Sequence, residues 1–210
     1  MHRPLARTSC PAWVAENPLQ PGGAGPRFAP MDYAIRAETA ADHVAVRAVH
    51  ALAFGDGDRV PALVDALRAA PAALPVVSLV ATHGDEAVGH VMLSACRLDA
   101  AARLVDVYSL SPLGIHPGHQ RRGLGGRLVA AALAAADAAG VPLVFLEGDP
   151  RYYARHGFVR ASGLDLRSPS LRIPDPGFQA HPLTAYEPWM TGTFVYSEPF
   201  WAHDCVGLRG

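Results

Sequence analysis

Residues 113–128 read LGIHPGHQRRGLGGRL, an apolar extended segment followed by a proline, an Arg-Gly loop and the start of a helix. Apolar residues at helical spacing predict that helix over 124–139, with a stop at Gly140. Glycines allow positive φ and let backbone N–H groups approach an anion closely. The loop Gly123 to Gly126 therefore lies at a helix N-terminus, where unpaired N–H groups and the helix dipole favour phosphate. Arg121 and Arg122 add charged donors.

A second motif follows the apolar run 143–146 and reads GDPRYYARHGF, residues 148–158. With these two motifs in this order, the chain resembles the GNAT superfamily of N-acetyltransferases, whose acetyl-CoA loop reads Q/R-x-x-G-x-G/A. Residues 120–125, QRRGLG, fit that loop. The family also places a tyrosine four residues before a Gly-Phe pair, as Tyr153 stands before Gly157.

The resemblance covers about residues 33–200, with a poor match over 161–190. Within the superfamily, the chain is similar to a bacterial subgroup described as predicted acetyltransferases. Residues 1–30 lie outside it and are rich in proline and glycine, so we expect a poorly ordered leader, with Met31 as a candidate start. Residues 31–210 are expected to form a single N-acetyltransferase domain.

The fold class expected is α/β (α+β), a GNAT-like mixed, mostly antiparallel sheet flanked by helices. Strands are predicted at 33–37, 76–83, 86–98, 103–115, 142–147, 158–161 and 192–197, and helices at 40–54, 59–70, 124–139 and 150–156. Prolines throughout 165–190 predict a packed loop. Its aromatic residues either shape the acceptor pocket or tie the loop to the core; they are Phe178, Tyr186 and Trp189.

Composition excludes several classes of function. A net charge of −1 gives no reason to expect nucleic acid or an anionic membrane surface as partner. Three separated cysteines without a C-x-x-C pair support neither a disulfide framework nor a thiolate zinc site, and a reducing cytoplasm is the simplest location. His116 and His119 lack matched carboxylate or thiolate partners, so no metal is predicted.

The resemblance implies transfer of an acetyl group from acetyl-CoA, the cosubstrate, to a primary amine by direct attack in a ternary complex. Tyr153 suits the general acid, because a phenol is protonated at neutral pH and can donate to the departing sulfur. Tyr152 is expected to pack. The family supplies its oxyanion donor from backbone N–H on an irregular strand, which corresponds to Leu113 and Ile115, and Pro112 favours such a strand. The expected CoA-binding residues are Leu113, Gly114, Ile115, Gln120, Arg121, Arg122, Gly123, Leu124, Gly125 and Gly126.

The sequence does not choose the general base. Glu147 and His116 each end a strand beside the expected cleft, and Asp106 is a third candidate. The alternative for each of the three is a solvated or hydrogen-bonded surface group. The acceptor amine stays open, and a homodimer is compatible with a late extra strand. The alternative function is a non-catalytic CoA- or acyl-CoA-binding regulatory module, which would need no acid. A dinucleotide-binding domain and a P-loop ATPase are weaker, since G-x-G-x-x-G and G-K-[ST] are both missing.

Overall fold

The computed structural model describes residues 32–55 and 57–207. The predicted leader over residues 1–30 and the candidate start at Met31 fall outside this part of the chain. Within it, every helix is too short or too polar to cross a lipid bilayer.

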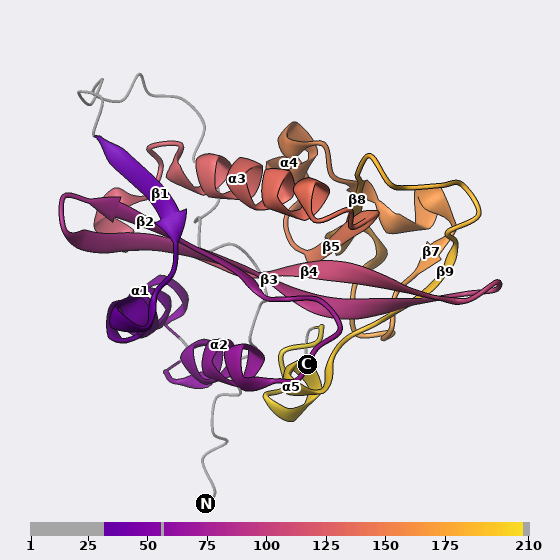
Figure 1. Ribbon diagram of the computed structural model, residues 1–210, viewed down its shortest axis with the longest axis horizontal. Helices are drawn as coiled ribbons and strands as arrows, with labels where there is room; N and C mark the ends of the chain where they lie inside the picture. The colour runs from indigo at the N-terminus through magenta and orange to yellow at the C-terminus, as the bar shows by residue number, and fades with distance from the viewer. Residues whose placement is uncertain (1–31, 56, 208–210) are drawn as a thin grey trace, which may run out of the picture.

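One mixed sheet forms the centre of the molecule (Figure 1). The strand path runs β1-β2-β3-β4-β5-β8-β6, and β9 pairs with β3 and β7. Pairing is antiparallel except between β4 and β5 and between β7 and β9. The strands are β1 (Tyr33–Ala37), β2 (Val77–His83), β3 (Glu86–Ala100), β4 (Leu104–Ile115), β5 (Leu143–Glu147), β6 (Val159–Arg160), β7 (Leu166–Arg167), β8 (Phe178–Pro182) and β9 (Gly192–Val195). The mixed, mostly antiparallel sheet expected from the sequence is confirmed.

Helices cover both faces of this sheet, with α1, α2 and α5 on one side and α3 and α4 on the other (Figure 1). The helices are α1 (His43–Phe54), α2 (Arg59–Ala69), α3 (Leu124–Ala138), α4 (Pro150–Tyr153) and α5 (Glu198–Ala202). Each layer encloses its own apolar core. One core packs Val46 and Leu63 against Phe145, and the other packs Leu128 against Val144. Successive side chains of β5 therefore enter opposite cores, as the pleat of a strand requires.

The predicted helix over 40–54 is confirmed in position and begins as a 3₁₀ turn over Ala40–Asp42. The Asp42 carboxylate accepts the Thr39 backbone N–H at 2.8 Å, as in a capping box. The Arg36 guanidinium donates two hydrogen bonds of 2.7 Å to the same carboxylate, and these bonds connect the end of β1 to the start of α1.

The packed loop expected over 165–190 is wrong, because this segment contains β7 and β8 and β8 pairs with β5. Pro182 is the last residue of β8, and the other prolines of this segment lie outside β7 and β8. Phe178 stacks on Phe145 with ring centroids 5.7 Å apart. Tyr186 and Trp189 pack against the core that contains Phe145, and the Arg103 guanidinium lies 5.3 Å from the centroid of the Trp189 ring. These contacts favour the alternative in which the aromatic residues tie the segment to the core.

Candidate functional site

Strand β4 separates from β5 halfway along its length. Among the described residues the two strands pair only at Tyr108–Val144 and Ser109–Phe145. Directly afterwards comes a cis Ser111–Pro112 peptide, and the register of β4 against β3 shifts between Leu110 and Leu113. This is a β-bulge, which adds one residue and bends the strand. The irregular strand predicted from Pro112 is thus present in the structure.

The backbone of β4 beyond the bulge points two N–H groups toward the side that β5 has left. The His116 N–H donates to the Val88 carbonyl of β3 at 2.9 Å. Since N–H groups alternate between the two edges of a strand, those of Leu113 and Ile115 point away from β3. These are the two positions for which the sequence predicts oxyanion and cofactor donors.

The loop that follows leads directly into the N-terminus of α3. Gln120 donates from its side-chain nitrogen to the Ile115 carbonyl at 3.1 Å, which fixes the loop against the strand. Arg121 and Gly123 both have positive φ, 60° and 78°, and Gly123 is the residue before the helix. The first-turn N–H groups of a helix have no intrahelical acceptor, so those of Leu124, Gly125 and Gly126 can bind an anion.

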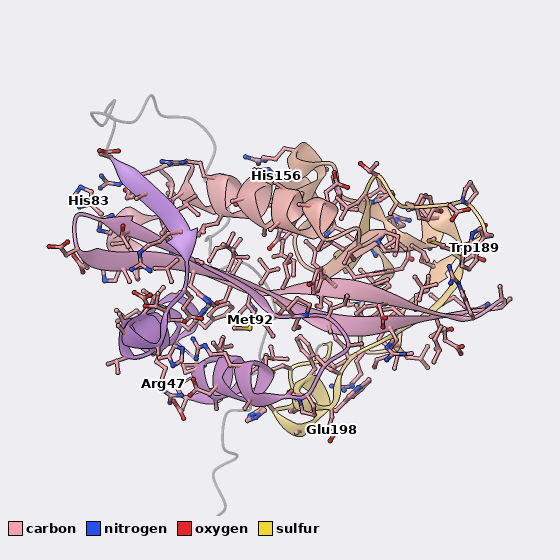
Figure 2. All side chains as sticks on the ribbon, in the orientation of Figure 1. Arg47, His83, Met92, His156, Trp189 and Glu198 are labelled. Atoms are coloured by element: carbon pink, nitrogen blue, oxygen red, sulfur yellow. The ribbon has the colours of Figure 1, made fainter. Side chains whose placement is uncertain are left out.

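The glycine at 126 has a second use in this turn. A Cβ added there would lie 2.8 Å from the His156 ring, which comes from the 3₁₀ turn Ala154–His156 directly after α4 (Figure 2). Gly126 therefore lets the start of α3 approach the segment that carries Tyr153. The loop that leads into α3 and the segment that carries Tyr153, which come from two separate sequence motifs, are neighbours in space.

Tyr153 ends α4 and is held from several sides. Its side chain is 3% exposed, and its ring lies 5.5 Å from that of Phe158. A Cβ on Gly148 would come within 2.3 Å of the Tyr153 ring, so the turn between β5 and α4 needs glycine for the ring to fit. Asp149 caps α4 by accepting the Arg151 N–H at 2.9 Å. The phenol belongs to the core on the α3 side of the sheet.

Glu147 lies at the same end of β5 but on the opposite face. Phe145, two residues earlier, belongs to the core beneath α1 and α2, and alternation puts the Glu147 side chain on that side. Continuing the parallel register places Glu147 level with Ser111, at the bulge. The Tyr196 hydroxyl donates to its carboxylate at 2.8 Å, and the Gly207 N–H donates at 3.1 Å.

The surroundings of the Glu147 carboxyl raise its pKa into the neutral range. Burial raises the pKa of the Glu147 carboxyl to about 7, although the hydrogen bonds from Tyr196 and Gly207 and the nearby Arg172 charge act in the other direction. Burial and the neighbouring carboxylate also raise the pKa of Tyr196 well above its ordinary value, so that phenol remains a donor. Neither Tyr196 nor Gly207 was a candidate from the sequence. The only available signal was an aromatic residue in the closing strand.

The other two base candidates lie away from the point where the strands separate. His116 uses Nδ1 to accept the Gly118 N–H at 3.1 Å and so caps the 3₁₀ turn Pro117–His119. Asp106 lies before the paired part of β4 and forms an ion pair with Arg97 at 2.8 Å. Of the three base candidates, Glu147 is the one that the fold places beside the bulge. Residues 32–55 and 57–207 contain no group of three or more His, Cys, Asp or Glu that could hold a metal ion.

Residues 76–160 match the family model described as an acetyltransferase (GNAT) domain. Over 118 residues the chain is 32% identical to YjhQ of Escherichia coli (strain K12), described as an uncharacterized N-acetyltransferase. That match covers 56% of this chain and 65% of the relative, so the chain spans just under two thirds of it.

Two solved structures resemble the whole arrangement. The GNAT family N-acetyltransferase YhbS of Escherichia coli, solved with CoA, has a TM-score of 0.72 at 26% identity and covers 84% of this chain and 96% of its own. A GNAT family acetyltransferase from Brucella melitensis, solved with acetyl-CoA, has a TM-score of 0.65 at 29% identity and covers 81% of this chain and 99% of its own. Residues 76–160 of the chain therefore match the GNAT acetyltransferase domain, and more than four fifths of the chain shares the fold of solved GNAT acetyltransferases.

Proposed function

We propose that this protein is an acetyl-CoA-dependent N-acetyltransferase that transfers the acetyl group directly to a primary amine in a ternary complex. One observation carries the proposal: β4 separates from β5 between Tyr153 on one face of the sheet and Glu147 on the other. Both structural relatives were solved with CoA or its acetyl ester, which supports the same cosubstrate here.

The phosphate-binding loop supplies the anchor. The backbone N–H groups from Arg121 to Gly126 at the start of α3 are the donors for the CoA pyrophosphate, assisted by the Arg121 and Arg122 side chains. The extended pantetheine arm would run along Leu113 to Ile115, where the backbone N–H groups face the side left by β5. In this position the thioester lies at the bulge, between the two faces of the sheet.

Transfer then requires a sequence of proton and electron-pair movements. An alkylammonium enters from the α1 and α2 face and gives one proton to Glu147, directly or through water. The amine lone pair attacks the thioester carbon, and the Leu113 N–H stabilises the resulting oxyanion. As the carbon–sulfur bond breaks, Tyr153 gives its proton to the thiolate. The acylated nitrogen then loses its second proton, which restores the Tyr153 phenol, and Glu147 releases its proton to water. The products are the amide, CoA thiol and one proton.

Ligand binding tests the first half of this proposal. Thermal unfolding with millimolar CoA or acetyl-CoA should show a clear rise in Tm, because a ligand that binds only the folded state stabilises it. No rise with either ligand would contradict the proposal.

Turnover tests the second half. Thiol release from acetyl-CoA should be measured with an arylamine, a polyamine, an aminoglycoside, an amino acid and a peptide with a free N-terminus. At least one should be acetylated, and Tyr153→Phe should lower that activity by a factor of about 10²–10⁴ while leaving the CoA-dependent Tm rise intact. Binding without turnover of any amine would favour the non-catalytic CoA-binding module instead.

A further inference from the structure

An imidazole that the proposed mechanism does not use lies against the first turn of α3. It belongs to His156, in the 3₁₀ turn that follows α4 (Figure 2). A Cβ added to Gly126 would lie 2.8 Å from Cε1 and 3.3 Å from Nε2 of this ring, but 3.9 Å from Nδ1. The edge of the ring that carries Nε2 therefore faces α3. His156 and Gly126 are both partly exposed, so the contact lies at the protein surface.

The backbone conformation of Gly126 does not require glycine. This residue lies inside α3, and its φ is not positive, in contrast to that of Gly123. Glycine within a helix is less favourable than alanine, because it loses more backbone entropy on folding. The space that an alanine side chain would occupy is filled by the His156 ring. Helix α3 therefore loses some stability where it brings an imidazole to its first turn.

The Nε2 atom of His156 is within reach of an anion bound at this turn. The Arg127 N–H donates to the Gly123 carbonyl at 3.2 Å, and the N–H groups of Leu124, Gly125 and Gly126 come before this bond. Standard bond lengths place the nitrogen of a residue about 2.5 Å from its own Cβ position. His156 Nε2 is thus at most about 6 Å from the Gly126 nitrogen. One phosphate group can accept a hydrogen bond from both nitrogens across this distance.

The groups that surround the His156 ring are cationic or neutral. Burial and the Arg155 charge lower the pKa of this ring, and no hydrogen bond within the described part of the chain opposes them. The positive end of the α3 dipole acts in the same direction. The carboxylate that starts α4, Asp149, is already paired with Arg151 at 3.3 Å. The other titratable groups are a phenol on α4, an imidazole on β8 whose pKa burial lowers, and two arginines in the loop before α3: Tyr152, His181, Arg121 and Arg122.

We infer that His156 Nε2–H donates to the CoA pyrophosphate and that this imidazole takes up a proton from solvent when the cofactor binds. This inference rests on the proposed binding of CoA at the α3 loop. In the empty site the helix dipole and the arginines disfavour a charged ring. Each phosphoryl group of the pyrophosphate carries a negative charge, and a nearby negative charge favours the imidazolium. The ring should therefore be protonated in the complex and lose that proton when CoA departs. CoA binds more tightly as the pH falls.

Calorimetric titration with CoA between pH 5.5 and 8.5 tests this coupling. His156→Gln keeps a hydrogen-bond donor but is never charged. A rise of one unit in the pKa of the ring on binding corresponds to a tenfold gain in affinity. At pH 5.5 the wild type should therefore bind CoA about tenfold more tightly than the variant, and at pH 8.5 the two dissociation constants should agree within about twofold. His203→Gln, after α5 on the opposite side of the sheet, should match the wild type at every pH.

Equal affinity of the wild type and His156→Gln at pH 5.5 would overturn the inference. A loss of affinity that is the same at every pH would also overturn it, because packing alone explains such a loss. Thermal unfolding verifies that each variant is folded. If the wild type fails to bind CoA at any pH, the proposed function itself is contradicted. If it binds CoA with a pH profile identical to that of the variant, only the role of His156 is wrong.

Dephospho-CoA identifies the phosphate that the ring contacts. It lacks the 3′-phosphate of CoA and retains the pyrophosphate, so the difference between the wild type and His156→Gln at pH 5.5 should persist. Disappearance of that difference would assign the ring to the 3′-phosphate and overturn the assignment to the pyrophosphate. Nitrogen NMR of histidine-labelled protein gives a second measurement. The pKa of His156 should rise by about one unit or more on addition of CoA, and an unchanged value would overturn the inference.

Discussion

Replacing Glu147 by Gln should make the protein more stable and inactive at the same time. The carboxyl has an ordinary pKa of 4.5 when the chain is unfolded and a pKa of about 7 when folded, chiefly because burial disfavours its charged form. That difference corresponds to about 3 kcal/mol at a pH above both values. Gln is neutral at every pH and still accepts from the Tyr196 hydroxyl, but its amide group fits the Gly207 N–H less well. We therefore expect a net gain of about 1–3 kcal/mol.

The pH dependence fixes the sign of this effect. A raised carboxyl pKa means that the folded protein binds more protons than the unfolded chain between pH 4.5 and 7. Stability of the wild type should fall as the pH rises through this range, and the fall should be complete somewhat above pH 7. The variant should lose this part of the pH dependence, so the two proteins should differ little at pH 4.5 and most at pH 8.

Urea unfolding at several pH values measures the difference, and thiol release measures transfer. Removing a general base should lower the rate by a factor of about 10²–10⁴. Glu187→Gln neutralises an exposed carboxylate and should alter stability by less than about 0.5 kcal/mol. A Glu147→Gln protein with unchanged stability at pH 8, or with wild-type turnover, would refute the assignment of this carboxylate as a buried base.

Three further substitutions separate binding from chemistry. Tyr153→Phe should lower kcat by a factor of about 10²–10⁴ with CoA affinity preserved in calorimetry, and unchanged kcat would remove Tyr153 as the acid. Gly123→Ala and Gly140→Ala both place alanine at positive φ, 78° and 71°, and each should cost about 1–2 kcal/mol in urea unfolding, but only the change at 123 should weaken CoA binding. Gly148→Ala forces a Cβ to 2.3 Å from the Tyr153 ring, so it should destabilise the protein by about 1–3 kcal/mol and reduce kcat, and a neutral result would show that the ring is free to shift.

The sequence predicts the α3 loop and the Tyr153 turn because both depend on local chemistry. Gly123 permits the positive φ that precedes α3, and Pro150 fixes φ at the first residue of α4, so their positions identify the two helix starts. The strand β8 was missed for the opposite reason. Its five residues lie among prolines, and it becomes a strand because β5 offers it a partner and an apolar face.

The choice of base also depends on contacts that are distant in the chain. Glu147, His116 and Asp106 all end or edge a strand, and nothing local distinguishes them. What distinguishes Glu147 is burial and its contacts with Tyr196 and Gly207, which lie 49 and 60 residues further along. The hydrogen bond between the buried His50 and His90 rings likewise spans 40 residues and has no periodic signature of its own. Long-range contacts of this kind arise from the packed sheet and not from local propensity.

A crystal structure of the protein with acetyl-CoA, in a slow Tyr153→Phe background, would test the central claim most directly. The account predicts the pyrophosphate on the backbone N–H groups from Arg121 to Gly126, and the thioester at the bulge where β4 leaves β5. The sulfur should lie beside the ring at position 153, and the acetyl oxygen should lie within about 3.2 Å of the Leu113 nitrogen. Acetyl-CoA bound elsewhere, or bound here with its thioester remote from both Leu113 and residue 153, would contradict the account.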